Sequence, residues 1–124
     1  MQKPTANEVY KMMEDAIGEK DMSPAMKLAY KNAPDLLVDH GISCAQSIKS
    51  ENNALDMKTS VLIFLASALA YKDDACLHAF TQLCDDVDIS NEELISMVRI
   101  VKHAASSGVI GASEPILDFI SKRK

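Results

Sequence analysis

Apolar residues recur along most of this chain at the three- and four-residue spacing of an amphipathic α-helix. The first such segment begins at a Thr5–Glu8 capping box, and Gly18 is placed to end it. Its apolar face consists of Val9, Met12, Met13, Ala16 and Ile17.

Prolines mark the start of two further helices. Ser23 is a good N-cap before Pro24, and Pro34 opens a third helix. Gly41 falls inside that third helix, where glycine costs about 1 kcal/mol relative to alanine. We therefore expect another helix to approach closely at this position. The other residues assigned to the third helix are Leu37, Cys44, Ala45 and Ile48.

The run from Val61 to Ala70 is continuously apolar and differs from the amphipathic segments. Asp56 is its expected N-cap, and the helix body is expected to extend from Lys58 to Tyr71. A helix that is apolar on all faces must be surrounded by other helices or by other subunits. The run has about half the length that a bilayer span needs, so it predicts a buried helix.

Three more helices are predicted downstream. The fifth begins at Asp73, the sixth begins at a Ser90–Glu93 capping box, and a short last one begins at Ser113. We expect Ser107-Gly108 and Gly111 to form a loop. The fifth helix carries Cys76, Phe80, Leu83, Cys84 and Val87 on one face, and the sixth carries Leu94, Met97, Val98, Val101 and Ala105. No segment shows sustained period-two alternation, so residues 1–124 predict a single all-α domain of six to seven helices.

Composition and charge restrict the classes of partner. Of the 124 residues, 48% are hydrophobic, which is enough for a core. The net charge of −5 argues against a nucleic-acid partner, which requires a basic face. The chain begins without an apolar signal segment, and three cysteines suit reduced thiols better than a secreted disulfide scaffold. We expect a cytoplasmic protein with no membrane partner.

Cys76 is the centre of the candidate chemistry. With Asp73 as N-cap, the backbone N–H of Cys76 donates to its carboxylate. The helix N-terminus favours a thiolate and the charges of Asp73 and Asp74 oppose it, so we expect no strongly activated thiol. His78 projects about 200° around the helix from Cys76 and cannot act as a base one turn away. Cys84 lies about 12 Å along the same helix, too far for a disulfide.

Each of these side chains also has a structural interpretation. Cys76 suits a buried, inert thiol on an apolar face, a single reactive cysteine, or a metal-binding role. Cys44 and Cys84 are interpreted as core residues. His78 and His103 are interpreted as solvent-facing or locally bonded imidazoles, while neither His103 nor His40 can be placed near Cys76 from the sequence.

No pattern predicts a cofactor or a metal. No His/Cys/Asp spacing matches a zinc site. Asp85, Asp86 and Asp88 lack the glycine and terminal glutamate of a calcium loop, and no glycine-rich phosphate loop is present. We expect neither cofactor nor metal.

Four short stretches follow one another in a characteristic order. They are Lys58 before Val61-Leu62-Ile63, then Asp73-Asp74-Ala75-Cys76, then Asp88-Ile89-Ser90, and then Glu92-Glu93-Leu94. This layout resembles the alkylhydroperoxidase-D-like family, which includes the carboxymuconolactone decarboxylases. In that family Lys-x-x-Glu-Leu-Ile opens a buried helix, Cys-x-x-Cys-x-x-x-His opens the next, and a Gly-Val/Ile-Ser turn leads into Glu-Glu-Ile or Glu-Glu-Leu. The resemblance implies an alkylhydroperoxidase-D-like helical domain that assembles into homotrimers or homohexamers.

The reactive positions of the family are largely replaced here. By this alignment its proton-relay glutamate falls on Val61, its first cysteine on Asp73 and its histidine on Phe80. Only the second cysteine remains, as Cys76. A dithiol peroxidase needs two cysteines that cycle through a disulfide and a base that generates the thiolate. The resemblance leaves Cys76 as the catalytic candidate, with Asp73 at the first-cysteine position and His78 close by in sequence.

Two classes of function remain open. In the first, the protein has lost the dithiol site and is a non-catalytic binding or assembly protein. In the second, it is a thiol-dependent peroxidase that uses Cys76 and an external electron donor, or a decarboxylase-type enzyme, which needs no cysteine pair. The expected partners are other copies of the chain and a small-molecule ligand. A pocket lined by Tyr71, Cys76, His78 or His103 would support the ligand-binding role.

Overall fold

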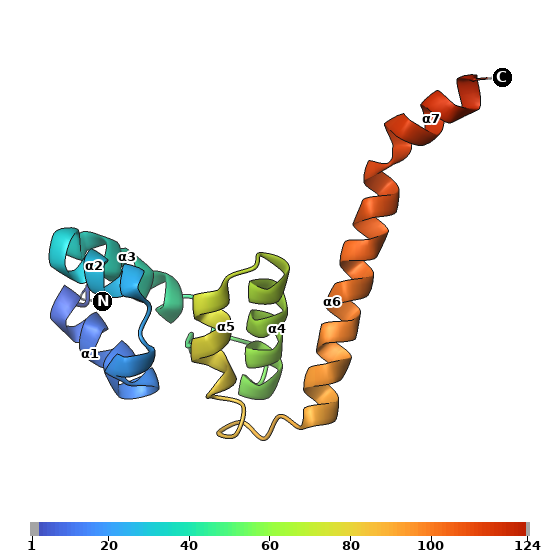
Figure 1. Cartoon of the computed structure of the whole chain (residues 1–124). Helices are drawn as coiled ribbons and strands as arrows, with labels where there is room; N and C mark the ends of the chain where they lie inside the picture. Colours follow the sequence, from blue (N-terminus) through green and yellow to red (C-terminus); the bar gives the residue numbers. More distant parts are fainter. Residues whose placement is uncertain (1–2, 124) are drawn as a thin grey trace. The chain divides into compact units, whose positions relative to one another are not determined.

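The computed structural model describes residues 3–123, which form seven α-helices, one short 3₁₀ helix and no strand (Figure 1). The all-α class predicted from the sequence is confirmed. The described chain falls into two compact units, one ending at Ile89 and the other starting at Ser90. The single domain expected over residues 1–124 stays a prediction.

The first three α-helices begin at the residues that the sequence indicates, and a 3₁₀ helix that it did not indicate follows the first of them. They are α1 (Ala6–Ile17), the 3₁₀ helix η1 (Glu19–Asp21), α2 (Pro24–Asn32) and α3 (Pro34–Ala45). Both hydrogen bonds of the Thr5–Glu8 capping box form, and Gly18 ends α1 with a φ of 80°, a value that favours glycine. Ser23 caps α2 by accepting from the N–H of Ala25.

Helix α1 packs closely on α3, as expected from Gly41. A Cβ atom added to Gly41 would lie 2.6 Å from Cγ2 of Val9. Val9 and Leu37 are fully buried at this contact region. Helix α2 also packs on α3, and its Tyr30 ring stacks on that of Tyr10 with centroids 4.3 Å apart. The predicted close helix neighbour of Gly41 is confirmed.

Helices α4 (Met57–Ala70) and α5 (Asp74–Thr81) lie side by side in the same unit (Figure 1). Asp56 caps α4 by accepting from the N–H of Thr59, as predicted. Val61 and Leu65 are buried, but Ile63 is 49% exposed. The first unit therefore covers only one face of α4, and its coverage by other subunits stays a prediction.

Helix α5 is shorter than the apolar pattern indicates. It ends at Thr81, and the segment up to Asp88 forms turns. Asp85 and Asp86 would place negative charge at the C-terminal end of a longer helix, which the helix dipole disfavours. Asp88 adopts a left-handed conformation with a φ of 56°, which turns the chain toward the next helix. The placement of Leu83, Cys84 and Val87 on the α5 face is therefore wrong, because all three lie beyond the end of the helix. Helix α3 also ends early, before Ile48.

The second unit contains α6 (Asn91–Ala112) and α7 (Glu114–Lys122). Both hydrogen bonds of the Ser90–Glu93 capping box form, as predicted. The loop predicted at Ser107-Gly108 and Gly111 is wrong, because α6 continues through both glycines. A single glycine costs a helix only about 1 kcal/mol, and neither residue has the positive φ of a helix stop.

Neither α6 nor α7 contains a buried residue. Their exposed large apolar residues are Ile95, Val98, Ile100, Val109, Ile110, Ile116, Leu117, Phe119 and Ile120. Among residues 3–123, no helix combines the length and apolarity needed to cross a bilayer.

Candidate functional site

Cys76 lies in the first turn of α5, where the predicted cap forms. The backbone N–H of Cys76 donates to Oδ1 of Asp73 over 3.1 Å. Hydrogen bonds from the thiol and the backbone of Cys76 hold the pKa of the Asp73 carboxyl below its usual value. Asp73 is therefore an ionised N-cap, and its position supplies no nucleophile.

The same arrangement keeps the Cys76 thiol protonated. Burial, followed by hydrogen bonding to Asp73 and by the charge of that carboxylate, raises the pKa of Cys76 to about 11. The thiolate, which is the nucleophile of thiol chemistry, is therefore a minor species at neutral pH. This agrees with the expectation that Cys76 is not strongly activated.

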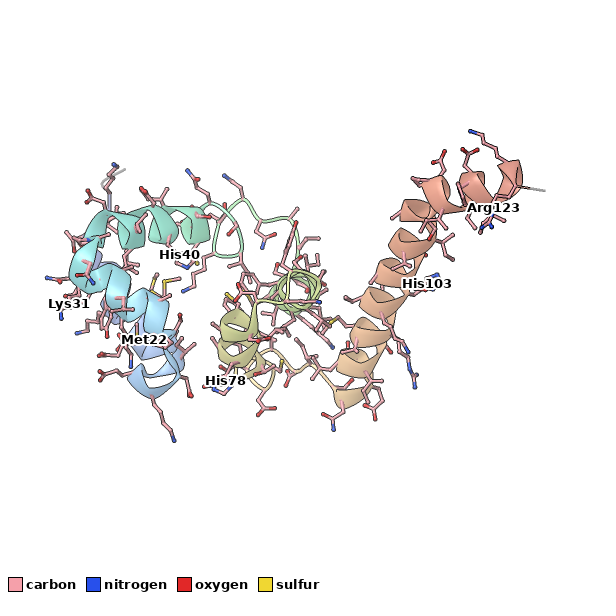
Figure 2. The ribbon with its side chains drawn as sticks, turned by 45° about the horizontal axis from the view of Figure 1, so that its top comes forward. Met22, Lys31, His40, His78, His103 and Arg123 are labelled. Carbon is pink, nitrogen blue, oxygen red and sulfur yellow. The ribbon has the colours of Figure 1, made fainter. Side chains whose placement is uncertain are left out.

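His78 is bonded to a carboxylate from a distant part of the first unit. Its Nε2 lies 3.1 Å from Oδ1 of Asp21, and Nε2 of Gln82 donates to Oδ2 of Asp21 over 2.8 Å. These two hydrogen bonds, that of Gln82 first, hold the pKa of Asp21 below its usual value. His78 therefore links α5 to η1, and its side chain remains 69% exposed. Figure 2 shows His78 on α5.

The two other residues that the sequence resemblance aligns with reactive family positions are packed apolar side chains. Val61 is 1% exposed in the core of the first unit. The Phe80 ring stacks on that of Phe64 from α4, with centroids 3.9 Å apart and planes inclined by 20°. Neither side chain can accept or donate a proton, so the relay of the family cannot operate through them.

An apolar cavity of about 150 Å³ lies between α1, α3, α4 and α5 in the first unit. Val61 and Phe80 contribute to its wall, together with three side chains that carry polar groups, namely His40, Cys44 and Lys49. The remaining lining residues are Met12, Met13, Ala16, Ile17, Ile48, Met57 and Leu83.

This cavity was not predicted from the sequence. Its lining includes none of Tyr71, Cys76, His78 and His103, the residues whose presence in a pocket would have supported ligand binding. Cys44 was interpreted as a core residue, but it is only partly buried and lines the cavity. The available signal was the spacing of His40 and Cys44, which places them one turn apart on the same face of α3.

Cys84 and the possible metal-ligating side chains are the last candidates for a reactive site. Cys84 is buried as predicted, and burial, followed by the charge of Asp85, raises the pKa of its thiol. All three cysteines are free thiols. Among the described residues, no group of three or more His, Cys, Asp or Glu side chains is arranged to hold a metal ion.

Comparison of the sequence with models of known protein families finds no match. A search of curated proteins finds no significant relative. The likeness to the alkylhydroperoxidase-D-like family therefore depends on the layout of residues 55–93 alone.

Proposed function

We propose that the protein is an alkylhydroperoxidase-D-like helical protein without dithiol peroxidase activity, which acts through binding or assembly. The state of Cys76 carries this proposal. Its thiol has a pKa of about 11 and lies beside the ionised carboxylate of Asp73, which aligns with the first cysteine of the family. A single protonated thiol cannot complete a cycle that passes through an internal disulfide.

The turn after α5 supports the structural part of this proposal. The family commonly has glycine at the position of Asp88, and Asp88 has the left-handed conformation that glycine adopts most readily. Ser90 then caps α6 as the serine of the family turn would. The order of α4, the thiol-bearing helix α5 and the tight turn therefore agrees with the order that the resemblance implies.

A decarboxylase-type enzyme is the second candidate, because that branch does not depend on paired cysteines. The cavity favours it over a peroxidase that uses Cys76. His40 and Cys44 line the same cavity as Val61 and Phe80. Val61 and Phe80 are the residues that align with the reactive glutamate and histidine of the family.

A peroxide-consumption assay with a dithiol reductant tests the main proposal. We expect wild type and Cys76→Ser to consume peroxide at the same background rate. Cys44→Ser is the matched control, because it removes another partly buried thiol in the same unit. A rate well above background that disappears in Cys76→Ser alone would contradict the proposal and support the thiol peroxidase.

We further propose that the protein is a homo-oligomer, as a homotrimer or homohexamer. The exposed Ile63 side of α4 and the uncovered apolar residues of α6 and α7 support this proposal. Apolar helix faces are normally covered by other elements or by other subunits. Light scattering at micromolar concentration is the test, and a monodisperse monomer would refute self-association.

A further inference from the structure

We propose that the cavity between α1, α3, α4 and α5 binds a small apolar molecule that carries one negative charge. The apolar part would occupy the cavity, and Lys49 and His40 would hold the anionic group at its polar edge. This inference names the class of ligand for the binding role proposed in the previous subsection, and it rests on that role. It does not depend on whether Cys76 is reactive.

The size and lining of the cavity set the apolar part of the ligand. A volume of about 150 Å³ is similar to that of an engineered apolar cavity that admits benzene. Apolar wall is provided by Met12, Met13 and Ile17 of α1 and by Leu83 after α5. Methionine side chains adapt their shape readily, so the cavity suits a compact aromatic or branched aliphatic group.

The polar edge sets the charge of the ligand. Within the described residues, neither the Lys49 ammonium nor the His40 ring has a hydrogen-bond or ion-pair partner. The described lining contains no carboxylate, although the whole chain has a net charge of −5. An ammonium group donates three hydrogen bonds, and imidazole donates at least one in either protonation state. A carboxylate would form a charge-assisted contact with the exposed Lys49 ammonium, whereas a neutral ligand would not.

Cys44 provides an internal reporter of occupancy. Its thiol lines the same cavity one helical turn from His40, and it is only partly buried. A bound molecule would cover this thiol and slow its alkylation by iodoacetamide. Cys76 does not line the cavity, so its alkylation in the same sample serves as the internal control.

The test compares benzoate with benzyl alcohol, which have similar shape and differ in charge. Binding is followed by protein NMR titration of the full chain, and Cys44 protection is followed by mass spectrometry of alkylated peptides. We expect benzoate to bind the wild type more tightly than benzyl alcohol does, and to protect Cys44.

Lys49→Gln should reduce this preference for benzoate about two- to fivefold, the range for one exposed ion pair. Lys31→Gln, which removes a positive charge outside the cavity, should leave it unchanged.

A second variant tests the location of the site. Ala16→Leu adds apolar volume at the cavity wall on α1, where leucine is well tolerated in a helix. We expect it to weaken benzoate binding at least tenfold and to abolish the protection of Cys44. Equal binding of benzoate and benzyl alcohol would overturn the anionic part of the proposal. Full benzoate affinity in Ala16→Leu, or equal losses in Lys49→Gln and Lys31→Gln, would overturn the site itself.

Discussion

Gly41 determines how closely α1 approaches α3. A Cβ atom at this position would lie 2.6 Å from Cγ2 of Val9, whose side chain is buried and stiff. Gly41→Ala should therefore lower the free energy of unfolding by about 1–2 kcal/mol, after allowance for the better helix propensity of alanine. Urea unfolding followed by circular dichroism measures this loss.

Two further variants isolate the steric cause. Val9→Ala in the Gly41→Ala background should recover part of the lost stability, because it removes the atom that the new Cβ meets. Gly108→Ala is the control, since it lies inside α6 with nothing within 4 Å of the added Cβ. Gly108→Ala should increase helix content or leave it unchanged. A Gly41→Ala protein as stable as wild type would show that the contact is loose.

The Cys76 thiol links stability to alkaline pH. Its pKa rises from 9.0 to about 11 on folding, so the folded protein retains this proton more firmly than the unfolded chain. The stabilisation from the neutral thiol is fully present below pH 9.0 and is lost as pH rises through about 11. The difference in unfolding free energy between wild type and Cys76→Ser should shrink across this range. A difference that is constant from pH 8 to about 11 would contradict the raised pKa.

Asp73→Asn tests the electrostatic cause of that shift. Asparagine caps helices about as well as aspartate, so the N-cap should survive while the negative charge is removed. We expect the pKa of Cys76 to fall and its alkylation at pH 8 to become several-fold faster. Burial is the largest cause of the shift and remains in this variant, so the thiol should stay less acidic than a free cysteine.

At the scale of elements, hydrogen bonds of the Asn53 side chain connect the loop after α3 to α4. Its Nδ2 donates to Oγ of the buried Ser60 over 2.8 Å and to the Ile48 carbonyl over 3.3 Å. Its Oδ1 accepts from the N–H of Leu55. Asn53→Ala should cost about 1–3 kcal/mol of unfolding free energy, because it removes these bonds and strands the Ser60 hydroxyl. The neighbouring exposed Asn52 makes no side-chain bond of this kind, so Asn52→Ala should be neutral in the same unfolding experiment.

Helix boundaries that depend on local chemistry were the most predictable feature of this fold. Thr5, Asp56 and Ser90 cap helices as their sequence neighbours indicate, because capping involves residues only three apart. Glycine was less informative. It ends α1 at Gly18, but α6 continues through Gly108, since a helix tolerates glycine where no turn is required.

Contacts between distant segments could not be predicted. His78 and Asp21 are 57 residues apart, and no spacing rule relates them. The cavity likewise combines residues from Met12 to Leu83, which only the packing of four helices brings together. The sequence therefore indicated the cap beneath Cys76, but it missed the cavity that His40 and Lys49 line.

At the scale of the whole molecule, the second unit lacks a core of its own. Helices α6 and α7 contain no buried residue, although Val98 and Phe119 are large apolar side chains. Isolated amphipathic helices gain most of their stability from the packing of their apolar face. In the proposed homo-oligomer, contacts between subunits would cover the apolar residues of this unit.

A pair of substitutions on α6 tests this role of the apolar face. Val98→Asp places a charge on the face that carries Leu94 and Val101, and Ser96→Asp places the same charge about 200° away around the helix. We expect Val98→Asp to shift the protein toward monomer in light scattering at micromolar concentration, because burying an unpaired carboxylate at an interface costs several kcal/mol. Ser96→Asp should keep the wild-type mass. Circular dichroism of both variants checks that α6 still forms. An unchanged oligomer in Val98→Asp would place the subunit interface elsewhere, with the exposed Ile63 side of α4 as the next surface to test.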